Sequence, residues 1–232
     1  MTESLIEARG LSAGYGKMAV VRELDIRVDP GEVVALLGPN GAGKTTTLLT
    51  LAGELPPMAG EVRFLGEATR APMHARCRAG LGFLTEERSV IMEMTVAENL
   101  KLAGVAPEVA IEGFPKLERI LGRRAGLCSG GEQQMVSLAR ALGRQPKVLL
   151  ADELSLGLAP MVVTSLLQAV RAAADERGVG VLLVEQHVRQ ALKIADRVYV
   201  MERGRIALSG TTAELAGQLD RIEAAYLTGD GA

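Results

Sequence analysis

Short, wholly apolar runs alternate with amphipathic stretches along the chain. Val33–Leu37, Val148–Ala151 and Val181–Val184 contain only aliphatic residues. Runs of this length are typical of parallel strands that are buried on both faces. Helical periodicity appears between them, over about Lys44–Ala52 and Met161–Arg177. The alternation predicts an α/β fold with a mainly parallel central sheet.

The two ends of the chain carry a different pattern. Leu24–Val28 alternates apolar and polar residues and predicts a half-exposed strand, and another strand is expected over residues 60–66. Near the other end, Gln190–Ala195 is expected to be helical. Val198–Met201 and Arg205–Leu208 flank a glycine turn and predict a hairpin.

Residues 86–128 differ from the rest of the chain. Thr95 and Glu98 have the spacing of a capping box that opens a helix, and glycines and prolines then interrupt the pattern. We interpret this stretch as a helical insertion. It is followed by a further expected helix over Gln133–Leu142.

Composition narrows the function classes. Aromatic residues make up 3% of the chain and Trp is absent, so aliphatic side chains must build the core. The net charge of −2 argues against a strongly basic nucleic-acid binder. Cys77 and Cys128 form no disulfide framework or metal-ligand spacing, and we expect reduced thiols in a cytosolic protein. No secretory signal and no apolar run of about 20 residues is visible. If the protein works at a membrane, another chain must cross it.

A glycine-rich loop follows the strand Val33–Leu37 and fits the phosphate-loop pattern G-x-x-x-x-G-K-[ST]. Backbone N–H groups of such a loop wrap phosphate oxygens, and the next helix directs its N-terminus at them. Lys44 adds a positive charge, and the Thr45 hydroxyl can ligate Mg²⁺. The residues expected at the phosphates are Gly38, Pro39, Asn40, Gly41, Ala42, Gly43, Lys44, Thr45 and Thr46.

Two carboxylates end the apolar run Val148–Ala151. In a phosphate-loop protein this is the expected second element. Asp152 would hold Mg²⁺, directly or through water, and Glu153 would act as general base on the attacking water. Without the phosphate loop, the same pair would be interpreted as solvent-facing acids at a strand end.

Between these elements, Ser129-Gly130-Gly131-Glu132 is followed by two glutamines and resembles the signature motif of ATP-binding cassette (ABC) ATPases. The spacing of Ser129 and Glu132 is also that of a capping box. In that family the signature binds the γ-phosphate of an ATP held by a second subunit. The resemblance therefore implies a head-to-tail dimer, homomeric or heteromeric, with two ATP molecules between the subunits.

The resemblance covers nearly the whole chain. Tyr15 matches the aromatic residue that stacks on adenine, although one aromatic residue is also compatible with a plain turn tyrosine. The family's architecture implies one ABC ATPase domain over residues 1–232. Residues 1–85 and 135–232 would form a phosphate-loop catalytic core with an N-terminal antiparallel β-subdomain. Residues 86–134 would form a helical subdomain that ends in the signature motif.

This sequence departs from the family pattern at three places. Glu86 stands for the usual glutamine after the third core strand, with Glu87 as the alternative; a carboxylate there could ligate Mg²⁺. The switch histidine is replaced by Gln186, unless the register is shifted and His187 serves. Leu154 and Ala159 replace a usual proline and aspartate around the loop that faces the other subunit.

These departures resemble the ATPase subunits of branched-chain amino acid importers and their urea or amide relatives. The likeness implies a cytoplasmic protein at the inner face of the cell membrane that hydrolyses ATP with Mg²⁺. Its implied partners are a second ATPase subunit, membrane permeases and a periplasmic or extracellular solute-binding protein, with no nucleic acid. The alternative is a regulatory or degenerate cassette in a non-transport complex.

Overall fold

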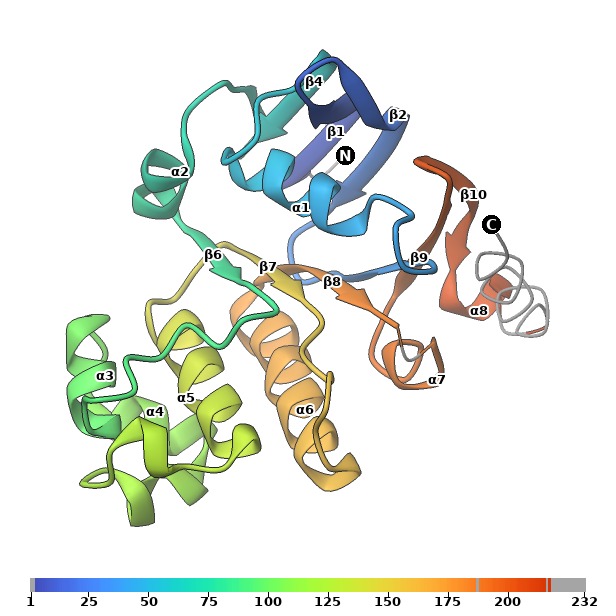
Figure 1. Ribbon diagram of the computed structural model, residues 1–232. Helices are drawn as coiled ribbons and strands as arrows, with labels where there is room; N and C mark the ends of the chain where they lie inside the picture. Colours follow the sequence, from blue (N-terminus) through green and yellow to red (C-terminus); the bar gives the residue numbers. More distant parts are fainter. Residues whose placement is uncertain (1–2, 187, 216, 218–232) are drawn as a thin grey trace.

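The structure is a computed structural model that describes residues 3–186, 188–215 and 217 of the 232-residue chain. Its centre is a six-stranded sheet with the order β10-β9-β3-β8-β7-β6 (Figure 1). Every neighbouring pair in this sheet is parallel except β9 and β10. The strands are β3 (Val33–Leu37), β6 (Leu81–Leu84), β7 (Val148–Asp152), β8 (Gly180–Glu185), β9 (Arg197–Glu202) and β10 (Arg205–Thr211).

The three apolar runs form the middle of this sheet, as the sequence predicts. All residues of β3, β7 and β8 are buried. Their side chains alternate between two hydrophobic clusters, so that Ala35 and Leu183 face one layer while Leu36 and Leu182 face the other. This period of two explains why an uninterrupted apolar run is needed here, because neither face of the strand meets water.

Helices cover both faces of the central sheet (Figure 1). The helix α1 (Lys44–Ala52) packs on one face through Leu48 and Leu51. The long helices α5 (Gly130–Gly143) and α6 (Pro160–Arg177) cover the other face. The predicted helices over Lys44–Ala52 and Met161–Arg177 are confirmed.

A second, four-stranded sheet lies on the α1 side of the molecule (Figure 1). Its order is β2-β1-β4-β5, and all of its pairs are antiparallel. The expected antiparallel β-subdomain is thus present. Its first strand pair is longer than the sequence pattern predicts. The strands are β1 (Ile6–Tyr15), β2 (Met18–Val28), β4 (Ala59–Phe64) and β5 (Glu67–Ala68), and the helix α2 (Met73–Ala79) follows them.

Short helices fill the segment between β6 and α5. Thr95 caps the first of them with the predicted capping box, in which the Glu98 N–H donates to Thr95 Oγ1 (3.2 Å) and the Thr95 N–H donates to Glu98 Oε2 (2.7 Å). The helical elements are α3 (Val96–Leu102), α4 (Pro107–Gly113), and the 3-10 helices η1 (Pro115–Ile120) and η2 (Ala125–Leu127). They fall within residues 86–134, where the helical subdomain is expected.

The helix predicted over Gln190–Ala195 is wrong in its position. The structure has a shorter helix, α7 (Val188–Ala191), followed by turns. The chain must leave the helix early because Asp196 returns to the start of β3. There the Asp196 N–H donates to the Val33 carbonyl (2.8 Å), and Asp196 Oδ2 accepts from the Val33 N–H (2.8 Å).

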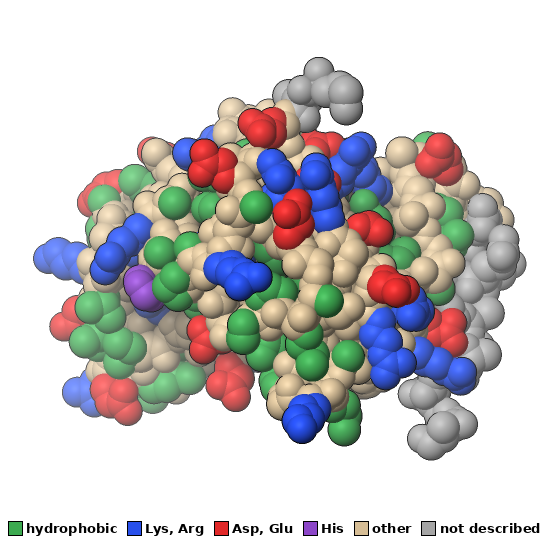
Figure 2. All heavy atoms as spheres, turned by 90° about the horizontal axis from the view of Figure 1, so that it is seen from above, with side chains coloured by type: hydrophobic (Ala, Val, Ile, Leu, Met, Phe, Trp, Pro, Cys, Tyr) green, Lys and Arg blue, Asp and Glu red, His purple; other side chains and the backbone are tan. Residues whose placement is uncertain are grey.

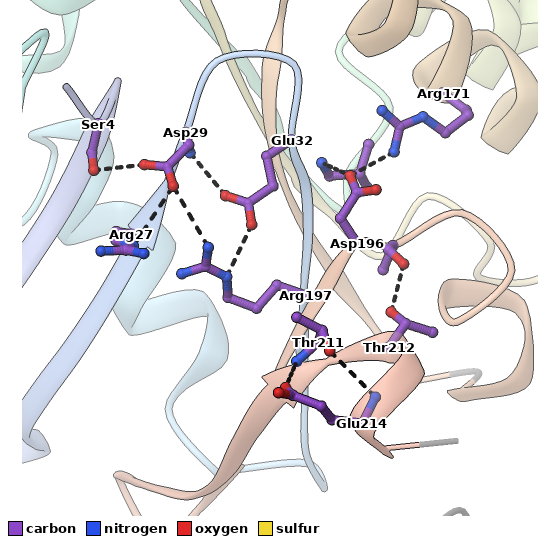
Figure 3. Close-up of polar contacts among 12 residues, drawn as sticks. Ser4, Arg27, Asp29, Glu32, Arg171, Asp196, Arg197, Thr211, Thr212 and Glu214 are labelled. Carbon is purple, nitrogen blue, oxygen red and sulfur yellow. Dashed lines mark hydrogen bonds and ion pairs between the residues drawn. The ribbon is translucent and has the colours of Figure 1, made fainter. Parts of the chain in front are cut away.

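A polar network fixes that corner of the sheet (Figure 3). Arg171 on α6 donates to Asp196 Oδ2 (2.7 Å), and Arg197 at the start of β9 pairs with Glu32 beside β3 (2.9 Å). From there the chain forms the predicted β9–β10 hairpin. Its two-residue turn has Arg203 and Gly204 both at positive φ, as a type I′ turn requires. A last short helix, α8 (Thr212–Leu215), follows. Among the residues that the structure describes, no helix has the length and apolar character of a membrane span.

The central strand gives a stability prediction. Leu36 is completely buried in β3, so Leu36→Ala should lower the free energy of unfolding by about 2–5 kcal/mol, through lost burial and the cavity left behind. Urea denaturation followed by circular dichroism measures this. Leu102→Ala is the matched control: its side chain is 58% exposed, and the change should stay within about 0.5 kcal/mol. Equal effects of the two substitutions would contradict this core assignment.

Candidate active site

The loop between β3 and α1 has a backbone that only glycine accommodates easily. Gly41 (φ +77°) and Gly43 (φ +105°) are left-handed. At Gly38 a Cβ atom would lie 2.3 Å from the Met201 carbonyl oxygen. Gly43 is also the N-cap of α1 and supplies no side-chain cap. The first amides of α1 are therefore available for an anion, and the helix dipole favours one there.

Lys44 is already held by this loop. Its Nζ donates to the carbonyl oxygens of Gly38 (2.8 Å) and Pro39 (3.0 Å). The side chain is 5% exposed, and burial lowers the pKa of its ammonium group, while Glu153 and Asp152 act in the opposite direction. A positive charge is thus fixed beneath the phosphate loop. The loop is anchored behind by the Ala42 carbonyl, which accepts from the Gly204 N–H (3.0 Å).

Asp152 ends β7 directly beside the start of α1. The Thr45 hydroxyl donates to Asp152 Oδ2 (3.0 Å). Burial raises the pKa of the Asp152 carboxyl; the Thr45 hydrogen bond opposes this shift, and the nearby carboxylates of Glu153 and Glu86 add to it. Asp152 Oδ1 is buried and has no hydrogen-bond partner among the described residues. A hard oxygen donor left without a partner beside a hydroxyl fits a Mg²⁺ ligand set.

Glu153 and Gln186 meet across the ends of β7 and β8. Gln186 Nε2 donates to Glu153 Oε1 at 2.6 Å. The Glu153 backbone is left-handed (φ +49°), which is uncommon for a residue with a side chain. Its N–H donates to the Val184 carbonyl (3.0 Å). The sequence places both residues at strand ends, and the structure shows that the two side chains touch.

Several of these groups line one cavity of about 530 Å³, whereas Gly38, Pro39, Ala42 and Asp152 are not among its lining residues. The described residues that line it are Val20, Asn40, Gly41, Gly43, Lys44, Thr45, Thr46, Glu86, Glu153, Leu156 and Gln186. Glu86 thus lies at the cavity, whereas its alternative Glu87 is not among the lining residues. His187, the alternative to Gln186, lies outside the described residues. The sequence does not predict Val20 as a lining residue, because an apolar residue in a strand has the same pattern whether it lines a cavity or packs in the core.

Two groups of predicted site residues lie elsewhere. Tyr15 is 55% exposed at the end of β1, paired with Met18, and does not line the cavity. Ser129, Gly130, Gly131 and Glu132 form the capped start of α5, in which the Ser129 N–H donates to Glu132 Oε2 (2.7 Å). They do not line the cavity either. A single chain therefore does not bring the signature to its own phosphate loop.

The model of the ABC transporter family matches residues 21–155, from β2 through the loop after Glu153. This chain belongs to that family. The ABC cassette is 41% identical to the high-affinity branched-chain amino acid transport ATP-binding protein BraG of Pseudomonas aeruginosa, over 94% of this chain and 97% of the relative. It is 32% identical to the lipopolysaccharide export ATP-binding protein LptB of Escherichia coli, over 97% of this chain and 98% of the relative.

Solved structures agree with this assignment. An ATP-binding cassette of an ABC transporter superposes with a TM-score of 0.87 at 25% identity, covering 97% of this chain and 99% of that one. The ATP-binding subunit of another ABC transporter gives 0.83 at 28% identity, covering 97% and 100%. The cassette is therefore an ATP-binding and ATP-hydrolysing subunit of an ABC transporter, as the phosphate loop and signature predict.

The buried Asp152 gives a prediction with opposite effects on stability and activity. Because its pKa is raised on folding, the folded cassette binds that proton more tightly, so this group's contribution to stability falls as pH rises above the unfolded pKa of about 3.9. Asp152→Asn removes the buried charge. It should raise the free energy of unfolding at pH 7, flatten the pH dependence of stability between pH 4 and 7, and abolish ATP turnover.

Thermal unfolding in EDTA without nucleotide, over that pH range, measures the stability effect. Asp175→Asn is the control, since Asp175 is 58% exposed and its ion pair with Arg171 lies at the surface. A lower melting temperature for Asp152→Asn than for the parent at pH 7 would contradict the prediction.

Proposed function

We propose that this cassette powers the uptake of branched-chain amino acids. The observation that carries the proposal is the 41% identity to BraG over nearly the full length of both chains, supported by 36% identity to a probable branched-chain amino acid transport ATP-binding protein, LivF, of Archaeoglobus fulgidus. Lipopolysaccharide export is the second candidate, because LptB is 32% identical with similar coverage. The identities to the two amino acid transport proteins, 41% and 36%, exceed the 32% identity to LptB of Escherichia coli and favour amino acids as the transported solute. The intact Lys44, Asp152 and Glu153 argue against a degenerate, regulatory cassette.

We assign the predicted site residues the roles that the family resemblance implies, and the contacts around the cavity support several of them. The phosphate loop and Lys44 bind the β- and γ-phosphates, and Tyr15 stacks on the adenine. Thr45, Asp152 and Glu86 would hold Mg²⁺ through oxygen ligands, and the ion would neutralise charge on the phosphates. Glu153 accepts the proton of the attacking water as general base. Gln186 takes the place of the switch histidine and holds Glu153 by its 2.6 Å hydrogen bond.

The location of the signature supports a dimer. Ser129, Gly130, Gly131 and Glu132 bind the γ-phosphate of an ATP held by a second cassette, either a copy of this chain or a sister subunit. Exposed apolar side chains occur near both halves of this composite site: Leu127 (74% exposed) precedes the signature, and Leu156 (45% exposed) lines the phosphate cavity. Closing the dimer would cover them.

A groove between α2, β6, α3 and α5 supports a membrane permease as partner. It has a volume of about 360 Å³ and is lined by residues that include Leu102, Ser137 and Arg140. Ser137 Oγ and Arg140 Nε are buried without a hydrogen-bond partner among the described residues. A permease segment with an apolar side chain would pack on the apolar lining of this groove, which includes Phe83 and Leu102. The cassette would then lie at the inner face of the membrane, with a solute-binding protein on the other side.

The charge distribution supports the absence of a nucleic-acid partner. On the face shown in Figure 2, basic and acidic side chains are interspersed. A nucleic-acid-binding surface is expected to gather Lys and Arg in a stripe or patch. The net charge of −2 adds to this argument.

The dimer proposal is tested with Glu153→Gln, which should slow hydrolysis and trap ATP between two subunits. Size-exclusion chromatography with light scattering should then show an ATP-dependent dimer. The same variant carrying Ser129→Arg should bind ATP and stay monomeric, because the long arginine side chain would occupy the space in which the signature binds the partner's γ-phosphate. A dimer that forms equally with or without ATP, or a Glu153→Gln protein that remains monomeric at saturating ATP, would contradict the proposal. For a heteromeric pair, the measurement uses both cassettes.

The transported solute is tested in the assembled transporter. The cassette is reconstituted with the permease subunits and the solute-binding protein of a branched-chain amino acid importer with which it assembles, and ATPase activity is measured with and without leucine, isoleucine or valine. These amino acids should stimulate turnover several-fold, and Lys44→Ala should abolish it. Stimulation by urea or a short amide instead, or co-purification with lipopolysaccharide, would reject branched-chain amino acids while leaving the ATPase assignment intact.

A further inference from the structure

A buried carboxylate stands at the end of β8 and has no part in the roles described above. Glu185 is 1% exposed. Glu185 Oε2 accepts from the Ser155 hydroxyl at 2.6 Å, and Glu185 Oε1 accepts from the Ser155 N–H at 3.1 Å. Ser155 is itself 3% exposed. Both oxygens of one carboxylate therefore bind a single residue on the loop that follows β7.

The position of Glu185 joins three functional loops. It pairs with Leu37, the last residue before the phosphate loop, in the parallel ladder of β3 and β8. It precedes Gln186, whose side chain donates to Glu153. Its side chain holds Ser155, two residues beyond Glu153.

The end of β8 and the residue after it contact the loop that follows β7 at three points. The Val184 carbonyl accepts from the Glu153 N–H at 3.0 Å, and Gln186 Nε2 donates to Glu153 Oε1 at 2.6 Å. Glu185 supplies the third point through Ser155. Three consecutive residues of β8 and its end therefore hold Glu153 and Ser155 from one side.

The backbone conformation of Glu153 explains why these contacts are needed. Its φ of +49° is left-handed, and a residue with a Cβ atom adopts that conformation only when its surroundings hold it there. The two hydrogen bonds between Glu185 and Ser155 are buried, and the low dielectric around buried groups strengthens such bonds. The Glu185–Ser155 contact is thus suited to fixing the loop directly after Glu153.

We propose that Glu185 and Ser155 form a positioning pair that holds the Glu153 carboxylate in its reactive orientation at the phosphate cavity. Neither residue lines the phosphate cavity, so both act through Glu153. The inference rests on the proposed role of Glu153 as general base. It predicts that the pair contributes to the chemical step and contributes little to ATP binding.

The test compares Glu185→Ala, Glu185→Gln and Ser155→Ala in steady-state ATP hydrolysis. Glu185→Ala should lower kcat by about 30- to 100-fold, a range expected when a catalytic group shifts by about 1 Å. Its KM for ATP should stay within a factor of about three. Glu185→Gln keeps one acceptor oxygen and should recover part of kcat. Ser155→Ala keeps its N–H and should lose about 3- to 10-fold. Glu176→Ala, the same substitution at an exposed site on α6, is the control and should leave kcat unchanged.

A double-mutant cycle separates positioning from general damage. If the two residues act as a pair, the variant with both alanines should have about the kcat of Glu185→Ala alone, because the interaction is already lost. Multiplicative losses would overturn the proposal, as would an unchanged kcat in Glu185→Gln and Ser155→Ala. A rise in the KM for ATP as large as the fall in kcat would also overturn it. So would a fall in kcat that tracks the fall in melting temperature across the variants. Glu185→Gln decides the matter if Glu185→Ala does not fold.

Failure of this proposal is distinguishable from failure of the proposed role of Glu153. Glu153→Gln is measured in parallel. If it retains the parental kcat, Glu153 is not the base and the positioning proposal falls with it. If Glu153→Gln is inactive while the Glu185 and Ser155 variants are fully active, only the positioning pair is rejected.

Discussion

β3, β7 and β8 are parallel neighbours whose residues are all buried, so charged groups can reach solvent or a ligand only where these strands end. Parallel pairing brings those ends to the same edge: Leu37 lies beside Glu185, and Asp152 lies beside Val184. The charged and polar site residues lie at or just after these strand ends: Lys44 after β3, Asp152 and Glu153 at β7, and Gln186 after β8. A register shift of one residue in β7 would turn Asp152 to the opposite face of the sheet and displace Glu153, which follows it, from the cavity.

Burying charge at this edge works against stability. The pKa of Lys44 is lowered and that of Asp152 is raised, so each group is displaced toward its neutral form, mainly through loss of water. The Lys44 ammonium is satisfied by the carbonyls of Gly38 and Pro39, and Asp152 Oδ1 has no partner among the described residues. The arrangement leaves both groups ready for charges that arrive with the ligand. Ligand binding then returns stability to the folded state by mass action.

Local signals explain how much of this site the sequence predicts. The phosphate loop and Asp152 are readable because each is set by its own strand and the turn that follows. The choice between Glu86 and Glu87 depends on which side of an extended turn faces the cavity, and no periodicity records that. The Glu185–Ser155 contact spans thirty residues of sequence and depends on the pairing of β7 with β8. The early end of α7 likewise depends on a distant partner, since Asp196 must return to Val33.

The loop from Glu153 to Leu156 links the cavity of one chain to its neighbour in the proposed dimer. Glu153 faces the cavity, and Leu156 also lines it while 45% exposed, so a partner closing over the site would press on the same short loop that carries the base. If a partner contacts this loop, other contacts must hold the Glu153 carboxylate in place when the partner is absent. The contacts from Val184, Glu185 and Gln186 meet this need from within the same chain, because Val184 and Glu185 end the fully buried strand β8 and Gln186 follows it directly. In the proposed dimer, the sheet would set where the Glu153 carboxylate stands, and the partner subunit would close the cavity that this carboxylate faces.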